Sequence, residues 1–417
     1  MAQEKDSGTV KTVNSIIPQY QPEVLKPTIQ LFVDFIEKGY GENLRFNELK
    51  RRPEWFDGEH WHEWTDVHES QMRAWMQTCY SLYQPKMLDD AIDIYFNQHR
   101  VNPIKEMLEG LKWDGKNRIE SFLIDIAKAD DTPYNREASR LIFAGGIHRA
   151  YRPGCKFDDM VVLVGKQGGG KSTMVRWLNM DDSFYREIKT INGKEGQETL
   201  RGVWIGEVAE LMAMTRAKEV ETVKAFITSQ EDSYRPPYAR HVETFPRMCS
   251  FIGTTNNEQF LSDQTGNRRF YPVKVTADGY DVFDKEKEAR EYIKQCWAEA
   301  VFRFKANDLQ PYAKRELLDA IRAAQEDAME DDWRVGAIQK YIEESLHPGD
   351  VVCVIELWHN ALHNPEESSP ARKDSIEISR ILINQLGLKR LGRKKLKKWG
   401  TQHAFGRFDA EFFPFWK

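Results

Sequence analysis

Cysteine is scarce in this sequence, and long apolar runs are missing. The 417 residues include 5 cysteines, which stand far apart and form neither a Cys-x-x-Cys pair nor a Cys/His spacing that suits zinc. This pattern argues against a disulfide framework and against a structural metal site. No run approaches the roughly 18 apolar residues of a membrane span, and residues 1–14 contain no apolar signal-peptide core. We therefore expect a cytoplasmic protein with no membrane partner.

An excess of charge of either sign is also missing. The sequence has 60 Lys and Arg against 65 Asp and Glu, a net charge of −5, and 41% of its residues are hydrophobic. These values exclude a disordered polyanion and predict packed cores. At about 150 residues per domain, the length predicts two or three domains. Because the net charge gives no sign of a nucleic-acid partner, the distribution of charge matters more than its sum.

The chain divides by pattern into three regions. Residues 1–145 are predicted to be a mostly helical N-terminal domain, in which the acidic stretch 55–69, rich in Trp and His, is better explained as an aromatic-packed surface than as a metal site. Residues 146–325 alternate apolar strands with helices, which predicts an α/β fold with a parallel sheet covered on both faces. An acidic cluster at 326–332 precedes a small third region, residues 333–417.

The third region contains a basic run with no intervening acid. The run follows a helical pattern that Gly387 closes, and it precedes Trp399 and an aromatic tail at 405–416. A helix, a basic turn and a β-like aromatic end suit a winged-helix-like module whose basic face meets phosphates. A solvated surface is the plain alternative. The basic residues of this run are Lys389, Arg390, Arg393, Lys394, Lys395, Lys397 and Lys398.

The strongest chemical signal is the stretch GKQGGGKST, which matches the phosphate-loop pattern G-x-x-x-x-G-K-[ST]. The apolar stretch 160–164 predicts the strand before the loop, and 173–178 predicts the helix after it. Glycines there let backbone N–H groups surround a β-phosphate, while Lys171 reaches the β- and γ-phosphates and Ser172 ligates Mg²⁺. The residues expected to bind the nucleotide are Gly165, Gly168, Gly169, Gly170, Lys171, Ser172 and Thr173.

A phosphate loop alone does not separate a kinase, a GTPase and a motor, so the motifs that follow decide. A short apolar strand predicted at 203–207 ends in Glu207, and Glu210 follows it. A carboxylate at the end of a strand beside the loop can hold Mg²⁺ or its water, and a second can polarise the attacking water. We expect Glu207 to be the Walker B acid and Glu210 its assistant, with a solvated glutamate as the alternative for Glu210.

Two further polar positions follow. A third strand, predicted at 249–255, ends before Asn256, which can position water against a γ-phosphate; an ordinary turn asparagine is the alternative. Arg268 and Arg269 stand directly before an apolar strand predicted at 270–275. An arginine from a neighbouring subunit can stabilise charge on a transferring phosphoryl group. We therefore expect one of the pair to act in this way, with an ion-paired surface as the alternative.

Residues 224–241 combine basic and aromatic side chains with two adjacent prolines. Prolines do not build a central strand, so the segment suits an exposed loop or hairpin. On a motor domain, such side chains suit binding to single-stranded DNA through phosphates and base stacking. A hairpin with no substrate role is the alternative. The residues expected to contact DNA are Lys224, Arg235, Tyr238, Arg240 and His241.

In order, the motifs are GKQGGGKST, WIGEVAEL, VKAFITSQEDSYRPPYARHVETFPR, IGTTN and DQTGNRRFYPV. This series resembles the virulence-associated protein E family of phages, prophages and pathogenicity islands, whose members look like superfamily 3 AAA+ helicases. The resemblance is specific over residues 111–275 and weaker in the C-terminal region. It implies a P-loop AAA+ core with ATP and Mg²⁺ as cofactors.

The resemblance also assigns roles to residues of this sequence. Lys171 and Ser172 fall on Walker A, Glu207 on Walker B, Asn256 on sensor 1, and Arg268 or Arg269 on the arginine finger. The segment called B′, which forms the DNA-contacting hairpin in superfamily 3, covers Lys224, Asp232, Arg235 and Tyr238. Glu207 and Glu210 are separated, whereas the wider superfamily has adjacent acids. Which of the two activates water therefore stays open.

The resemblance implies an ATP-dependent DNA helicase or translocase for phage or mobile-element replication in a bacterial host. We expect a homo-oligomer, a hexamer, with the N-terminal region as its collar and with single-stranded and forked DNA as partners. Asp90 and Asp93 lie in a helical pattern, so we expect no primase domain in this chain and a separate primase or replication protein beside it. The alternative is a DNA-binding ATPase switch, a replication initiator or a host-interference factor without processive unwinding.

Overall fold

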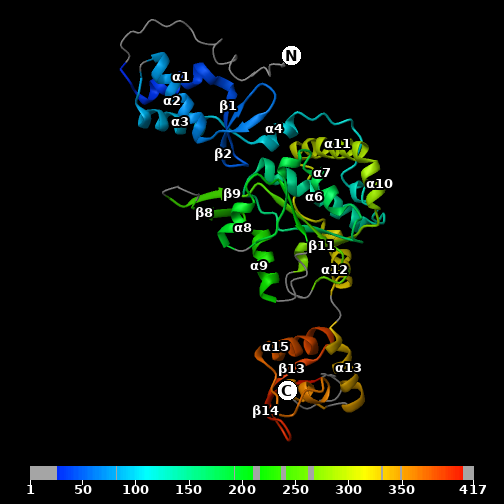
Figure 1. Cartoon of the computed structure of the whole chain (residues 1–417). Coiled ribbons are helices and arrows are strands. Elements are labelled where there is room, and N and C mark those ends of the chain that lie inside the picture. Colours follow the sequence, from blue (N-terminus) through cyan, green and yellow to red (C-terminus); the bar gives the residue numbers. More distant parts are fainter. Residues whose placement is uncertain are drawn as a thin grey trace, which may run out of the picture. The chain divides into compact units, whose positions relative to one another are not determined.

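The structure is a computed structural model that describes residues 26–80, 82–191, 193–209, 217–235, 241–261, 267–329, 332–347 and 350–406. The chain forms two compact units, which divide after Met329. Figure 1 colours them along the sequence. Across the described ranges, we find no helix with the length and apolar content that crossing a membrane requires.

The N-terminal part of the first unit contains a sheet that our prediction of a mostly helical domain missed. A four-stranded sheet in the order β3-β2-β1-β4 shares one core with α1, α2 and α3. Its strands are only two to five residues long and mostly half-buried, so they carry little apolar alternation. The elements are α1 (Ile29–Tyr40), β1 (Leu44–Asn47), β2 (Arg52–Phe56), β3 (Trp61–Glu63), α2 (Asp66–Tyr80), α3 (Pro85–Gln98) and β4 (Arg100–Val101).

The sheet that carries the candidate site has five parallel strands in the order β11-β5-β10-β7-β6. It confirms the α/β fold with a parallel sheet that the alternating pattern predicted. Because β10 lies between β5 and β7, residues that follow β5 and β10 meet at one edge of the sheet. The strands are β5 (Met160–Val164), β6 (Tyr185–Glu187), β7 (Ile205–Ala209), β10 (Ser250–Thr255) and β11 (Phe270–Lys274).

Helices cover both faces of this sheet, as a parallel sheet requires. Alternate residues of β5 belong to two cores: Val161 and Leu163 pack with α6, α7 and α11, whereas Val162 packs with α9 (Figure 1). The helices and the remaining hairpin of this unit are α4 (Pro103–Glu109), α5 (Phe122–Asp125), α6 (Pro133–Tyr151), α7 (Lys171–Leu178), α8 (Gly193–Thr199), α9 (Ala217–Thr228), β8 (Glu231–Tyr234), β9 (Glu243–Pro246), α10 (Gly279–Asp284), α11 (Glu286–Lys305) and α12 (Leu318–Asp327).

Helix α6 runs through the point at which we expected a domain boundary, between residues 145 and 146. A Cβ atom on Gly145 would lie 2.3 Å from the ring of Phe157, and one on Gly146 would lie 2.5 Å from the ring of Trp297. The indole N–H of Trp204 donates to the carbonyl of Gly146 at 3.1 Å. These close contacts make α6 part of the core beneath the sheet, so the expected boundary falls inside a buried helix.

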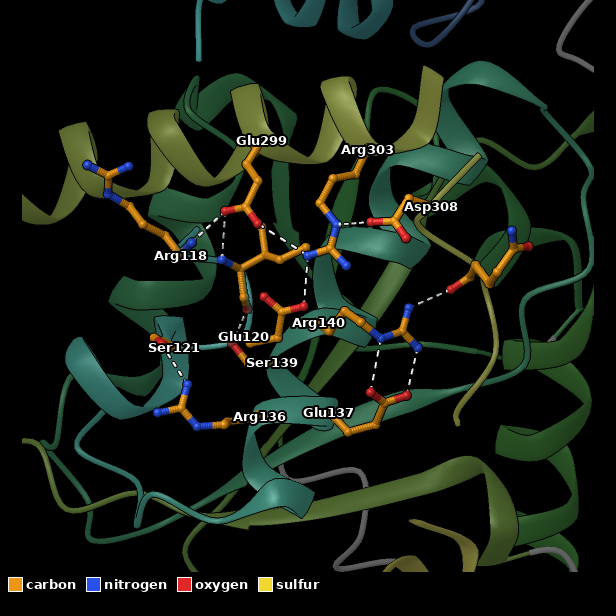
Figure 2. Close-up of polar contacts among 12 residues, drawn as sticks. Arg118, Glu120, Ser121, Arg136, Glu137, Ser139, Arg140, Glu299, Arg303 and Asp308 are labelled. Carbon is orange, nitrogen blue, oxygen red and sulfur yellow. Dashed lines mark hydrogen bonds and ion pairs between the residues drawn. The ribbon is translucent and has the colours of Figure 1, made fainter. Parts of the chain in front are cut away.

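A buried polar network ties α11 to the segment before α5. The carboxylate of Glu299, which is fully buried, accepts hydrogen bonds from the backbone N–H groups of Arg118 and Ile119 at 2.5 and 3.1 Å. Figure 2 shows Arg303 between Glu299 and Glu120, with ion-pair distances of 3.2 and 2.7 Å. Burial raises the pKa of Glu299, and its donors offset this effect.

In the second unit, most of the residues that we predicted to form a basic turn form a strand instead. Residues Lys389–Leu396 form β13, which pairs with β14, and only residues 397–399 form the turn between them. Pairing with β14 keeps this charged segment extended, and charges suit an exposed strand. Phe405 is buried in β14, whereas the rest of the aromatic tail, from residue 407, lies outside the described residues. The unit contains α13 (Trp333–Ser345), β12 (Val352–Cys353), α14 (Val354–Asn360), α15 (Arg372–Arg380), the π-helical turn η6 (Ile381–Gln385), β13 and β14 (Gly400–Gly406).

The network around Glu299 predicts a large loss of stability when that carboxylate is removed. Glu299→Ala leaves Arg303 partly unpaired and the N–H groups of Arg118 and Ile119 without their acceptor, so we expect the free energy of unfolding to fall by about 3 kcal/mol. Glu291→Ala, on the exposed side of the same helix, is the matched control and should change it by less than about 0.5 kcal/mol. Urea unfolding of both variants measures the difference, and equal effects would contradict the prediction.

Candidate functional site

The loop between β5 and α7 has the backbone geometry that its glycines allow. Gly170 caps α7 with φ +76°, a left-handed conformation that side chains disfavour. A Cβ atom on Gly165 would lie 2.5 Å from the carbonyl oxygen of Val275, so this position has no room for a side chain. Helix α7 begins at Lys171, and the N–H groups of its first turn have no partners within the helix. The loop is therefore suited to an anion.

A cavity of about 690 Å³ lies beside this loop. The residues from Gln167 to Thr173 line one part of it, and Thr254, Thr255 and Asn256 line another. All the expected nucleotide-binding residues except Gly165 are therefore among the lining residues, and Gly165 lies at the start of the same loop. Glu187, Ile188, Lys189 and Ala209 complete the lining.

Lys171 connects the loop to the end of β10. Its ammonium group donates to the carbonyl oxygens of Gly165 and Lys166, each at 2.7 Å, and to Oδ1 of Asn256 at 2.9 Å. The side chain is almost completely buried, and burial lowers the pKa of Lys171 although the charge of Glu207 opposes this shift. The expected Walker A lysine and the expected sensor thus meet directly.

Glu207 is held by three hydroxyl groups. Ser172 and Thr254 donate to its Oε1 at 2.7 and 2.6 Å, and the hydroxyl of Tyr185 donates to Oε2. Glu207 lies in the middle of β7, not at the end of a strand as we predicted, because β7 continues to Ala209 beside β10. The carboxylate is buried and does not line the cavity, whereas its donors Ser172 and Thr254 do.

Sequence reasoning missed Tyr185 and Thr254. Tyr185 begins β6, the edge strand beside β7, and its ring is also covered by the guanidinium of Arg176 at 5.2 Å. Burial and the hydrogen bond to Glu207 raise the pKa of Tyr185, so its hydroxyl stays a donor. Thr254 stands two residues before Asn256, and its position could have been inferred from the order of the strands. Tyr185 belongs to no motif, and only the pairing of β6 with β7 brings it to the site.

The two arginines expected to act on a phosphoryl group lie away from this cavity. Arg268 is exposed and Arg269 is half-buried in the 3₁₀ turn Asn267–Arg269, directly before β11. Neither is a lining residue of the cavity. Glu210, the expected assistant of Glu207, lies outside the described residues.

The segment expected to contact DNA forms an antiparallel hairpin of β8 and β9. Arg235 directly follows β8 and His241 precedes β9, and both are exposed. Tyr238 and Arg240 lie outside the described residues. The prediction that Lys224 contacts DNA is wrong. Lys224 lies on α9 and is buried, because its face of the helix packs into the core. Its ammonium group is therefore not available to DNA in this chain.

The C-terminal lysines lie on the surface of their unit. Lys394 and Lys395 are exposed on β13, and Lys397 and Lys398 are exposed in the turn that follows. Lys398 lies 3.6 Å from Glu366, with both side chains mostly exposed. An exposed pair of this kind is weak, so it leaves the charge of the hairpin largely available.

The side chains at the loop fit the chemistry of a phosphate and a hard cation. The hydroxyl of Ser172 and the carboxylate of Glu207 supply the oxygen ligands that Mg²⁺ prefers, and they lie within hydrogen-bond distance of each other. The N-terminus of α7 and the ammonium of Lys171 supply donors and positive charge for phosphate oxygens. The nucleotide and the metal ion themselves stay predictions.

The comparisons with known proteins concern both the sequence and the fold. Residues 108–330, just over half of the chain, match the family described as the virulence-associated protein E-like domain. No curated protein sequence matches the chain. The A form apo structure of the NrS-1 C-terminal region is similar, with a TM-score of 0.51 and 11% identity over 91% of this chain and 99% of that chain. A second apo structure of that region has a TM-score of 0.50 and 11% identity with the same coverage.

At 11% identity these structures show likeness of fold alone. The family match is independent of them and covers the loop, β7, the β8–β9 hairpin and β10. It confirms the resemblance drawn from the order of the motifs. The chain belongs to the virulence-associated protein E-like family.

Proposed function

We propose that this protein is an ATP-driven DNA translocase that opens duplex DNA during replication of a phage or mobile element. The observation that carries the proposal is the convergence of Lys171, Ser172, Glu207 and Asn256 beside one cavity. Lys171 and Ser172 come from the start of α7, the helix after β5, whereas Glu207 comes from β7 and Asn256 directly follows β10. Family membership supports the biological setting.

The order of the strands supports a P-loop AAA+ core. In such a core the strand of the sensor lies between the strand of the phosphate loop and that of the Walker B acid, and β10 has this position between β5 and β7. A kinase acting on a small molecule would need an acceptor site beside the γ-phosphate, for which the sequence offers no motif. Hydrolysis of ATP by water is therefore the reaction that we propose.

Some of the residues at the loop would bind the phosphates, and others would bind the metal ion. Lys171 would exchange its contacts with two backbone carbonyls for the β- and γ-phosphate oxygens, while Asn256 would orient the attacking water. Ser172 and Glu207, the latter directly or through a water, would hold Mg²⁺, which would neutralise charge on the phosphates when bound. Glu210 remains the candidate to polarise the water, because Glu207 is already engaged by three hydroxyl groups.

The position of the paired arginines supports catalysis between subunits. Arg268 and Arg269 precede β11, outside the lining of their own cavity. One of them can reach a nucleotide only if a second copy of the chain presents its cavity to it, as an arginine finger supplied in trans does. We therefore propose a homo-oligomer, a hexamer, in which the β8–β9 hairpins move single-stranded DNA.

The C-terminal unit supplies a second contact with DNA in this proposal. Its elements follow the order α13-β12-α14-α15-β13-β14, a helical core with a terminal β-hairpin that suits a winged-helix-like module. The hairpin of β13 and β14 carries seven Lys and Arg side chains between residues 389 and 398 and no acid. Such a hairpin suits the phosphates of duplex DNA without reading its sequence.

Replacement of Lys171 tests the catalytic part of the proposal. Lys171→Ala removes the ammonium group from the phosphate site, so ATP turnover stimulated by single-stranded DNA should fall by about 100-fold or more. Lys156→Ala, an exposed lysine outside the cavity, should retain wild-type turnover. Phosphate release measures both, and undiminished turnover in Lys171→Ala would make the assigned site wrong.

Replacement of Glu207 tests the proposed role of this residue in binding Mg²⁺. Glu207→Gln keeps the shape of the side chain but removes its negative charge, so we expect the Mg²⁺ concentration for half-maximal turnover to rise at least about tenfold. Titration of Mg²⁺ at saturating ATP measures this shift. Glu195→Gln, on the exposed surface of α8, is the control. An unchanged Mg²⁺ requirement in Glu207→Gln would exclude Glu207 from the metal site.

Replacement of two lysines tests the C-terminal hairpin. Lys394→Ala with Lys395→Ala should weaken duplex binding and reduce the slope of log affinity against log salt by about 1.8. Lys340→Ala with Lys373→Ala removes the same charge from exposed positions on α13 and α15. Fluorescence anisotropy with a duplex at several salt concentrations compares the pairs. The same slope in both would show a general charge effect and no specific role of β13.

A further inference from the structure

One side chain of the N-terminal sheet contacts both strands of the β8–β9 hairpin. Arg51 lies in the turn between β1 and β2, and its Nη1 donates to the hydroxyl of Tyr234 at 2.7 Å. Its Nη2 lies 3.5 Å from Oδ2 of Asp232, and its Cζ lies 4.1 Å from the ring centre of Phe245. Asp232 and Tyr234 belong to β8 and Phe245 to β9. The three contacts therefore fix the hairpin from its buried face.

The turn that carries Arg51 is itself fixed to the turn between α8 and β7. The backbone N–H of Gly202 donates to the carbonyl of Leu49 at 2.9 Å. The guanidinium of Arg201 donates to the carbonyls of Lys50 and Arg51 at 3.2 and 3.3 Å. Arg51 has φ +53°, a strained conformation for a residue with a side chain. Such strain persists where surrounding contacts hold the residue in place.

Asp232 gives the contact its electrostatic basis. Its carboxylate is completely buried, and Oδ1 pairs with Arg247 at 2.5 Å. Within the part of the chain that the structure describes, Oδ2 accepts no hydrogen bond, and the guanidinium of Arg51 is the cation beside it. A buried carboxylate needs compensating charge. Loss of Arg51 would therefore leave this side of Asp232 without compensation and loosen the hairpin at its base.

We propose that Arg51 is a positioning residue through which the N-terminal sheet fixes the β8–β9 hairpin and so sets its affinity for single-stranded DNA. The second half of this inference rests on the proposed function of the hairpin. Arg235 and His241, the described residues nearest to the hairpin's tip, are exposed. A hairpin held at its base needs less ordering when DNA binds, and smaller ordering costs give tighter binding. Through Arg51, the N-terminal domain thus contributes to DNA binding without a contact between Arg51 and the DNA.

Hydrogen–deuterium exchange in the full chain tests the positioning without ATP or DNA. In Arg51→Ala, the amides of 231–234 and 243–246 should exchange about tenfold faster than in the wild type. Arg51→Lys should restore part of the protection, because lysine keeps the charge but not the planar donor pair. Arg52→Ala is the matched control, since Arg52 is the next residue and pairs with Glu63 inside the N-terminal sheet. It should leave the hairpin amides unchanged.

DNA-stimulated ATP turnover then tests the consequence. The concentration of single-stranded oligonucleotide for half-maximal stimulation should rise about tenfold in Arg51→Ala and not in Arg52→Ala, with the maximal rate retained. Tyr234→Phe removes only the acceptor hydroxyl and should shift the same concentration in the same direction, by less. It keeps the test valid if Arg51→Ala does not fold.

The outcomes separate this inference from the proposed function. Unchanged exchange in Arg51→Ala and Tyr234→Phe would overturn the positioning role whatever the protein does. Equally faster exchange of the hairpin amides in Arg51→Ala and Arg52→Ala would also overturn it, because it would indicate a general loosening of the N-terminal sheet. A third outcome combines faster exchange in Arg51→Ala, but not in Arg52→Ala, with a wild-type turnover that does not respond to DNA. It would support the positioning role of Arg51 and contradict the proposed function.

Discussion

The site depends on one geometric constraint, the insertion of β10 between β5 and β7. Parallel strands end at the same edge of a sheet, so the loop after β5 and Asn256 after β10 meet there. The same order lets the hydroxyl groups of Ser172 on α7 and Thr254 on β10 donate to one carboxylate oxygen of Glu207. If β7 instead lay between β5 and β10, Asn256 would lie about 5 Å farther from the loop after β5.

The charged groups of the site are already compensated within the chain. Lys171 is held by two carbonyls and Asn256, and Glu207 by three hydroxyl groups. Folding therefore already orders these side chains, and in the proposed mechanism they would only exchange partners when phosphate and metal bind. Asp232 follows the same principle between Arg247 and Arg51. Buried charge thus joins the N-terminal sheet to the hairpin.

Local motifs predicted the centre of the fold, because the phosphate loop requires a strand before it and a helix after it. Strand β5 and helix α7 follow from that pattern. The N-terminal sheet was missed because its strands are short and half-buried. The buried position of Lys224 was missed because residue type does not reveal which face of α9 enters the core. Tyr185 and Arg51 could not be found, since strand pairing and a contact between residues distant in sequence bring them to their sites.

Strand displacement from a forked DNA duplex with ATP and Mg²⁺, with Lys171→Ala as the control, tests translocation most directly. We expect release of the displaced strand by the wild type and none by the variant. Hydrolysis of ATP by the wild type without release of a strand would contradict translocation. It would favour a nucleotide-controlled switch or replication initiator that binds DNA and does not unwind it.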